Sequence, residues 1–280
     1  MRFGVGFQSH IERSWKHALL AEQVGLNNAW FVDSQLIASD VFACLALAAS
    51  QTTRIVLGTG VAVSDTRIPP VIAHSIATIN QLAPGRVILG LGSGHTAWRA
   101  MGMTPMPIKA FRQTVEVCRG LLHEGQALYR ARGRENTIRF LDTENGYINI
   151  DDRVPVYVAA SHPRAQSLAG ELGDGVITLS LLSPTVLERN LEAVAKGRAI
   201  RAAGTPEQFA AATFAVACVL QPGEAINSPR VLARVGPRIA VSLHYAYEQA
   251  RQGMEVPPFL APFLTPAYQA YLEARWKVIH

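Results

Sequence analysis

The sequence is short of cysteine and of charge, and it has no long hydrophobic run. Three of its 280 residues are cysteine, and 17% are Asp, Glu, Lys or Arg. The cysteines lie far apart in apolar segments, which favours buried free thiols over a disulfide framework; they are Cys44, Cys118 and Cys218. No apolar run is long enough to cross a bilayer. We therefore expect no membrane partner, and free thiols indicate a reducing cytoplasm.

The positive charge of the chain is too small and too scattered to indicate a nucleic-acid-binding surface. The formal net charge is +5, from 26 Lys and Arg against 21 Asp and Glu, and the basic residues are scattered. The densest basic group, at residues 130–139, lies in a polar connection and is interpreted as a solvated loop. We expect no nucleic-acid partner, and the phosphate of a small ligand is the more natural anion. The first residues form a strand pattern directly, so we also expect no signal peptide.

Several catalytic motifs are missing as well. The histidines and cysteines do not pair at the intervals typical of metal ligands, so no metal site is expected. The turn Leu91-Gly-Ser-Gly-His95 lacks the lysine of a P-loop, and the chain has no Gly-x-Ser-x-Gly nucleophile elbow. These absences argue against metal-dependent, nucleotide-hydrolysing and serine-hydrolase chemistry.

The sequence is rich in apolar segments that alternate between strand and helix patterns. Hydrophobic residues make up 49% of the chain, enough to bury the core of one α/β barrel. Short apolar runs are each followed by helical spacing. The predicted strands cover residues 2–8, 28–32, 54–63, 86–91, 154–159, 175–179 and 209–220; the predicted helices cover residues 12–24, 41–49, 71–82, 111–122, 163–173, 185–203 and 230–251.

This regular order predicts a wholly parallel sheet, because right-handed crossovers place each strand beside its predecessor. Seven strand–helix units favour a TIM-like (β/α)8 barrel over an open sheet. The eighth unit is uncertain. Residues 277–279 could complete the barrel as a strand, the unit could be degenerate, or a neighbouring subunit could cover the exposed edge.

We expect one barrel domain over residues 1–280, with two irregular parts. A polar excursion at about residues 124–153 is predicted to form a small hairpin over the rim, from alternating residues 138–141 and 147–150. An irregular C-terminal segment begins at about residue 252.

Two of the predicted strands end in glycine-rich stretches that suit a flat ligand. Gly58 and Gly60 follow one strand, and Gly92 and Gly94 follow the next. Ligands of parallel sheets bind beyond the carboxyl ends of the strands. A phosphate site is predicted separately at residues 161–164, where a serine and a histidine precede a proline and an arginine at a helix start.

Three blocks of the sequence resemble the luciferase-like group of flavin and deazaflavin oxidoreductases. They are AWFVDS at residues 29–34, LGTGVAVSDTRIPPVIAHSIATINQLAPGRVILGLGSG at residues 57–94, and VAASHPRAQSLAGELGDGVI at residues 158–177. The chain is most similar to the methylene-tetrahydromethanopterin reductase branch. The resemblance implies a TIM-like barrel that holds reduced FMN or the deazaflavin coenzyme F-420 at the carboxyl ends of the strands, and usually a homodimer.

The resemblance also implies a role for each block. Gly60 and Val61 match a bulge that carries a non-proline cis peptide and presses against the isoalloxazine. Residues 92–95 match a loop beside the pyrimidine end, and residues 159–161 match the turn that receives the ribityl phosphate. The residues that the resemblance places around the cofactor are Ser34, Gly60, Val61, Gly92, Ser93, Gly94, Ala159, Ala160, Ser161, His162 and Thr178.

His10, Asp33 and His95 are the candidate catalytic residues. His10 could donate a proton or hold a substrate carbonyl, or be a rim histidine with ordinary hydrogen bonds. Asp33 could bind the cofactor or act as a base, but an Asp before a Ser also caps helices. His162 could cap its helix or bind phosphate. Relatives that use the deazaflavin often place a glutamate in the first strand, where this chain has Gly6.

The expected function is that of a flavin-dependent oxidoreductase, either a monooxygenase or a hydride-transferring reductase, which acts on a small organic substrate. FMN is the first expectation and the deazaflavin the alternative, and a separate flavin reductase is a possible partner. A cofactor-less barrel that acts as a binding or structural protein stays open. So does a phosphate-binding isomerase without a redox cofactor, which would need a catalytic Glu or Lys at a strand end.

Overall fold

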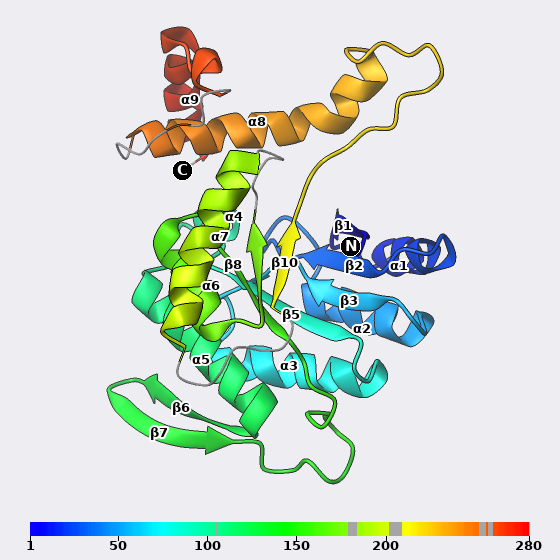
Figure 1. Ribbon diagram of the computed structural model, residues 1–280, viewed down its shortest axis with the longest axis vertical. Helices are drawn as coiled ribbons and strands as arrows, with labels where there is room; N and C mark the ends of the chain where they lie inside the picture. The colour runs from blue at the N-terminus through cyan, green and yellow to red at the C-terminus, as the bar shows by residue number, and fades with distance from the viewer. Residues whose placement is uncertain (105, 179–183, 202–208, 252–255, 257–259, 280) are drawn as a thin grey trace. The chain divides into compact units, whose positions relative to one another are not determined.

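Figure 1 shows the computed structural model of the chain, which describes residues 1–104, 106–178, 184–201, 209–251, 256 and 260–279. By their contacts these residues divide into two compact units, Met1–Phe214 and Ala215–His280. Each unit is described by itself, and the single barrel domain over residues 1–280 stays a prediction.

The first unit is built on a parallel sheet, as the sequence predicts. The strand order is β1-β2-β3-β5-β8-β9-β10, every pairing in this sheet is parallel, and β4 also pairs with β5. The sheet curls as in a TIM barrel, and β10 and β1 do not pair in the part of the chain that is described. The strands are β1 (Gly4–Gln8), β2 (Asn28–Val32), β3 (Val56–Thr59), β4 (Ala62–Val63), β5 (Val87–Gly92), β8 (Val156–Ala159), β9 (Gly175–Thr178) and β10 (Ala210–Thr213).

Helices cover the outer face of this curl (Figure 1). The main core lies between them and the sheet, and it includes Phe31, Leu45, Ile76, Leu89 and Phe111, all nearly fully buried. The amphipathic spacing seen in the sequence places these side chains on the inner faces. The helices are α1 (Ser14–Gln23), α2 (Val41–Gln51), α3 (Pro69–Leu82), α4 (His95–Ala100), α5 (Ile108–Glu124), α6 (Pro163–Leu172) and α7 (Pro184–Ala199).

A second, smaller cluster fills the inside of the curl. Trp30, Ile88 and Ile177 are buried there, with Tyr157 and Phe214 packed against them. The Trp30 ring meets the Phe214 ring edge-on, at 5.9 Å between centroids. An inward-facing residue from each of several strands therefore closes the interior below the carboxyl end of the sheet.

The polar excursion forms a hairpin, but of the predicted residues only 138 and 139 belong to it. β6 (Gln126–Ala131) pairs antiparallel with β7 (Arg134–Arg139). Arg132 and Gly133 both have positive φ, at 52° and 72°, which is the conformation of a tight two-residue hairpin turn. Residues 147–150 form no strand; there the Asn149 N–H donates to the Ala77 carbonyl on α3, at 3.0 Å.

The hairpin also lies at the other rim of the barrel from the ligand-binding end. It follows the C-terminus of α5, and that helix runs back from the carboxyl ends of the strands to their beginnings (Figure 1). The excursion therefore takes no part in the end of the sheet where the glycine-rich loops gather.

The predicted strand at residues 277–279 is wrong, because these residues are the last turn of a helix. The seventh strand is also shorter than predicted, since β10 covers Ala210–Thr213. The second unit contains α8 (Pro229–Arg251), the short 3-10 helix η1 (Ala261–Phe263) and α9 (Pro266–Ile279).

All three cysteines are free, as expected, although Cys218 is half-buried rather than buried. No helix within the described ranges has the length and apolar character to cross a membrane. In the same ranges, no three His, Cys, Asp or Glu residues come together in a way that could hold a metal ion.

Candidate active site

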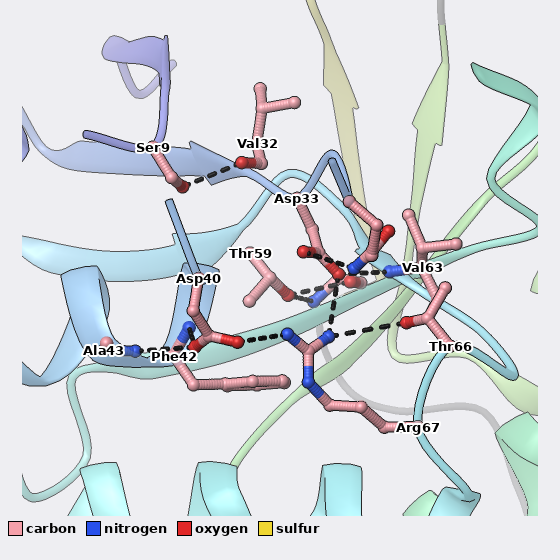
Figure 2. Close-up of polar contacts among 12 residues, drawn as sticks. Ser9, Val32, Asp33, Asp40, Phe42, Ala43, Thr59, Val63, Thr66 and Arg67 are labelled. Atoms are coloured by element: carbon pink, nitrogen blue, oxygen red, sulfur yellow. Dashed lines mark hydrogen bonds and ion pairs between the residues drawn. The ribbon is translucent and has the colours of Figure 1, made fainter. Parts of the chain in front are cut away.

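The loops after β1, β2, β3, β5 and β8 all lie at the carboxyl end of the sheet, because the strands are parallel. Figure 2 shows the polar contacts that hold the loops after the first strands. This is the end at which the sequence places its candidate residues.

The loop between β3 and β4 carries a cis peptide between Gly60 and Val61, as the family resemblance implies. Just before it, the Thr59 hydroxyl donates to the Gly90 carbonyl at 2.7 Å and accepts from the Gly90 N–H at 2.9 Å. A Cβ at Gly90 would lie 2.1 Å from the Thr59 carbonyl oxygen. Only glycine at position 90 allows β5 to approach Thr59 this closely. The Thr59 hydroxyl therefore replaces the backbone hydrogen bonds between β3 and β5 at the point where β3 ends.

Asp33 anchors the far side of this bulge (Figure 2). Its Oδ2 accepts from the Val63 N–H at 3.0 Å and from Arg67 Nη1 at 3.1 Å, while its Oδ1 accepts from Gln35 Nε2 at 2.7 Å. The residue is 6% exposed. Both carboxylate oxygens are therefore engaged within the protein, which gives Asp33 a positioning role; its predicted catalytic role stays a prediction.

Arg67 joins the bulge to the start of α2. Besides Asp33 it pairs with Asp40, and its guanidinium lies over the Phe42 ring at 4.9 Å from the centroid. Asp40 caps α2, accepting from the N–H groups of Phe42 and Ala43 at 2.9 and 3.0 Å. Burial opposes ionisation of Asp40, but the Ala43 N–H and Arg67 hold its pKa below the ordinary value. The helix cap considered for Asp33 thus belongs to Asp40.

The loop after β5 packs directly against the bulge. A Cβ at Gly92 would lie 2.4 Å from Val61 Cγ2 and 3.5 Å from the Ala159 Cβ. Gly94 has a φ of +71°, and a Cβ there would lie 2.1 Å from Val63 Cγ1. The structure therefore brings together Val61, Gly92 and Ala159, one from each of three predicted cofactor-binding loops.

Several buried polar atoms near these loops have no partner. Among the described residues, six buried side-chain polar atoms lack a hydrogen bond, and three of them follow β2, β4 and β5: Gln35 Oε1, Ser64 Oγ and Trp98 Nε1. The other three belong to Arg119, His123 and Arg201. Buried polar groups are paired in nearly all native proteins, so unpaired ones at one end of a sheet indicate a polar ligand.

His10 lies on the exposed rim after β1. Its Nδ1 accepts from the Glu12 N–H at 3.3 Å, so in the neutral imidazole the proton lies on Nε2. The preceding residue, Ser9, donates its hydroxyl to the Val32 carbonyl at 2.7 Å and joins the ends of β1 and β2 (Figure 2). His10 therefore presents a proton donor on a loop that is itself fixed.

The turn after β8 is less tied down. Ala160 donates to the Ile177 carbonyl at 2.9 Å, and Ser161 is exposed. His162 is the N-cap residue of α6, but its side chain makes no capping hydrogen bond, so the capping interpretation is wrong; Pro163 occupies the first turn as predicted. Thr178 is buried at the end of β9, where its carbonyl accepts from the Phe214 N–H at 3.3 Å.

The remaining candidates lie in the same region. His95 is the first residue of α4, and its side chain lies outside the described part of the chain. The carbonyl of Ser34 accepts from the N–H groups of Ile37 and Ala38 at the start of a turn. Sequence reasoning missed Arg67. The available signal was its position in the loop after one strand, with two aspartates in the loop after the preceding strand.

Gly6 has a neighbour that the sequence does not indicate. A Cβ at Gly6 would lie 3.0 Å from the ring of Phe214, and a Cβ at Gly60 would lie 2.9 Å from the same ring. The Phe214 ring therefore occupies the space beside Gly6, the position near which the family resemblance led us to expect a glutamate.

The chain matches the family model described as luciferase-like monooxygenase over residues 4–259. It is 32% identical to a 5,10-methylenetetrahydromethanopterin reductase of Methanolobus tindarius over 219 residues, 77% of this chain and 64% of the relative. It is 34% identical to an F420-dependent glucose-6-phosphate dehydrogenase of Beutenbergia cavernae over 202 residues, 64% of this chain and 57% of the relative. The chain thus spans less than two thirds of the length of these curated relatives.

Solved structures share the fold. The coenzyme F420 dependent tetrahydromethanopterin reductase from Methanopyrus kandleri superposes with a TM-score of 0.65 at 23% identity, over 84% of this chain and 75% of that one. The oxygenating constituent of 3,6-diketocamphane monooxygenase from Pseudomonas putida, in complex with FMN, gives a TM-score of 0.64 at 18% identity, over 91% and 80%. With these likenesses and the family match, the chain belongs to the luciferase-like monooxygenase family.

Proposed function

We propose that this protein is an oxidoreductase that binds coenzyme F420 at the carboxyl end of its sheet and transfers a hydride between the coenzyme and a small organic substrate. One observation carries the proposal: Val61 and Ala159 both lie beside Gly92 at this end, so the three loops that the family resemblance places around the ring come together there. Three separate loops that converge on one place form a surface for one flat ligand.

The residues at this end fit such a cofactor. Gln35 Oε1, Ser64 Oγ and Trp98 Nε1 are buried without partners on neighbouring loops, and an isoalloxazine-type ring offers both donors and acceptors along its pyrimidine edge. Val61, which is half-buried at the bulge, supplies the apolar contact that the face of the ring needs. The donor set and the apolar wall therefore match a ring that is flat and apolar on its face but polar at one edge.

When it is bound, the cofactor supplies the hydride chemistry, and the protein supplies position and protons. Asp33 and Arg67 hold the bulge, so Val61 keeps its place against the ring. In substrate reduction a hydride adds to carbon and a proton adds to the neighbouring heteroatom. His10 Nε2 carries a proton on the rim and can deliver it.

From the sequence alone, FMN was the first expectation. The names of the relatives favour the deazaflavin instead. The two curated relatives named above are, by their names, a methanopterin reductase and an F420-dependent dehydrogenase. FMN with oxygen activation is the second candidate, supported by the FMN complex among the structural neighbours. The homodimer, the separate flavin reductase, the monooxygenase activity and the cytoplasmic location stay predictions.

Turnover with each cofactor tests the proposal. We expect the protein to accelerate the anaerobic oxidation of reduced F420 by at least one member of a panel of small aldehydes, ketones and imines. The His10→Phe variant should lower this rate about 100-fold, the low end of what a positioned proton donor contributes. Oxygen uptake with reduced FMN, followed in parallel, measures the second candidate.

The matched control is His74→Phe, because His74 lies on α3 and is exposed away from these loops. It should leave the rate unchanged. The proposal is overturned if saturating reduced F420 supports no turnover above the protein-free rate, and oxygen uptake with reduced FMN would then favour the second candidate. Unchanged turnover in His10→Phe would remove His10 from the reaction and leave the cofactor assignment standing.

A further inference from the structure

A groove of about 350 Å³ lies between α5 and α6, and its lining includes Arg164, the last residue of the phosphate site that the sequence predicts at residues 161–164. Three of its lining residues come from the first two turns of α5 and three from the first two turns of α6. They are Ile108, Lys109 and Arg112, and Arg164, Ser167 and Leu168. The lining thus contains three cationic side chains, one hydroxyl and no acidic side chain.

One of the three cations is already neutralised. Arg112 donates to Glu171 Oε1 at 2.7 Å and also pairs with its Oε2, and it lies 3.5 Å from Glu116. These contacts raise the pKa of Arg112, and the guanidinium lowers the pKa of Glu171. This bidentate pair between α5 and α6 fixes one end of the groove, and its charges compensate each other.

The other two cations have no such partner. Within the part of the chain that the structure describes, Lys109 and Arg164 make no ion pair, and both are exposed at the groove. Arg164 lies on α6 and Lys109 on α5, so the two charges face the groove from opposite walls. An anion between them would meet positive charge on both sides.

The helix ends add to this positive potential. Neither α5 nor α6 has a side-chain cap or an acidic residue in its first turn, and their N-cap residues are Pro107 and His162. The first N–H groups of both helices therefore lack an acidic partner, and each helix end carries partial positive charge. Two such ends and two unpaired cations at one groove are the elements of an anion site.

We propose that this groove binds phosphate or carboxylate groups, held between Lys109 and Arg164 with Ser167 as a hydroxyl donor. The anion comes either from the acidic chain of the bound coenzyme or from a free phosphate-bearing molecule. Arg164 stands three residues after Ser161, so a cofactor whose phosphate lies at that turn can extend acidic groups along α6. The first source rests on the proposed function, and the second does not.

Binding of three probes tests the groove: coenzyme F420, its riboflavin-like deazaflavin fragment without phosphate or glutamate, and inorganic phosphate. Wild type is compared with the double variant Lys109→Ala/Arg164→Ala, whose two positions are exposed and leave the core intact. If the coenzyme supplies the anion, the variant weakens F420 binding about tenfold, from two lost charge contacts. Binding of the fragment stays unchanged, and added salt narrows the difference in F420 affinity.

The control is Arg134→Gln/Arg139→Gln, which removes the same charge from β7 at the opposite rim. It should leave all three affinities unchanged. If phosphate binding alone is lost in the groove variant, the groove binds the free anion. If the variant and wild type bind F420 and phosphate equally well, the proposal is overturned. Failure of the fragment to bind wild type would count against the proposed function and not against the groove.

Discussion

The N-terminus of α2 and the N-termini of α5 and α6 lie at the same rim of the sheet, but they differ in capping and in ion pairing. Asp40 caps α2 and pairs with Arg67, which in turn pairs with Asp33. At α5 and α6 no side chain caps the helix, and Lys109 and Arg164 have no ion pair among the described residues. The positive end of α2 is thus neutralised by side chains of the protein, whereas the positive ends of α5 and α6 are open to an anionic ligand.

This difference assigns different physical tasks to the two sides. Around α2, paired charges and short contacts fix the bulge that carries Val61, so a ring placed against it meets a preformed wall. Around α5 and α6, the groove is open, and its cations Lys109 and Arg164 form no ion pair among the described residues. Changes on the first side should therefore lower stability, while changes on the second should lower ligand affinity and leave stability nearly unchanged.

The largest expected effect is on the closed side, at Gly90. Alanine there would place a Cβ 2.1 Å from the Thr59 carbonyl oxygen, and neither buried strand can move away. We expect Gly90→Ala to lower the free energy of unfolding by more than about 3 kcal/mol, measured by urea denaturation. Gly236→Ala is the control: it lies within α8 with no atom near its Cβ, and it should not destabilise the chain. A loss below 1 kcal/mol at Gly90 would contradict the close approach.

Asp33→Ala should come next, with a loss of about 2 to 3 kcal/mol in the same measurement. The substitution leaves the buried Val63 N–H without an acceptor and removes one of the two carboxylates of Arg67. Asp33→Asn keeps an acceptor for one of these donors and should lose less. Equal losses in the two variants would show that the carboxylate charge, rather than the hydrogen bond to Val63, holds the bulge.

Pro107→Asp tests the open side, because it gives α5 the kind of cap that α2 has. The new cap and the lost proline have opposite effects on stability of about 0.5 to 1 kcal/mol each, so the free energy of unfolding should change little. Phosphate affinity should fall severalfold, since the carboxylate competes for the same positive end. Asn136→Asp adds the same charge on β7 and is the control. Unchanged phosphate affinity in Pro107→Asp would show that the N-terminus of α5 does not contribute to anion binding in the groove.

The smallest effect concerns the opposite end of α5, where His123 is buried. Burial lowers the pKa of His123, although its hydrogen bond to the Val154 carbonyl at 2.9 Å and the nearby Asp174 favour the protonated ring. The unfolded chain therefore takes up a proton below about pH 6.5 before the folded chain does. The contribution of His123 to stability should be complete above that pH and should be lost progressively as the pH falls below it.

Denaturation of wild type and His123→Gln at several pH values checks this effect. The variant should show a flatter pH dependence in this range, because glutamine does not titrate. The carboxylates with lowered pKa values, such as Asp40 and Glu171, act at lower pH and do not interfere. An identical slope in both proteins would assign the pH dependence to another group.

The sequence predicts the parallel sheet because its signal is local: each buried strand is an apolar run, and each helix has one apolar face. It also places Gly60, Gly92 and Ser161 at one end, since parallel strands end together. The hairpin was misplaced because its turn, Arg132-Gly133, depends on two positive φ angles that polar composition does not reveal. Residues 277–279 read as a strand because three residues carry too little periodicity to distinguish strand from helix.

The charged network could not be derived from the sequence. Asp33 and Asp40 lie in the loop between β2 and α2, whereas Arg67 lies in the loop before α3, and only the pairing of β2 with β3 brings the two loops together. The groove between α5 and α6 is similar, because Lys109 and Arg164 are 55 positions apart in the sequence. Long-range pairing of this kind follows from the packing of helices on the sheet and leaves no local pattern.

Titration of the full chain with F420 and with FMN, under one set of conditions, tests the central claim most directly. We predict saturable binding of F420, with an affinity that exceeds that for FMN because the groove between α5 and α6 contacts the longer acidic chain. Absence of binding for both cofactors at millimolar concentration would contradict the account and leave a barrel protein without redox chemistry.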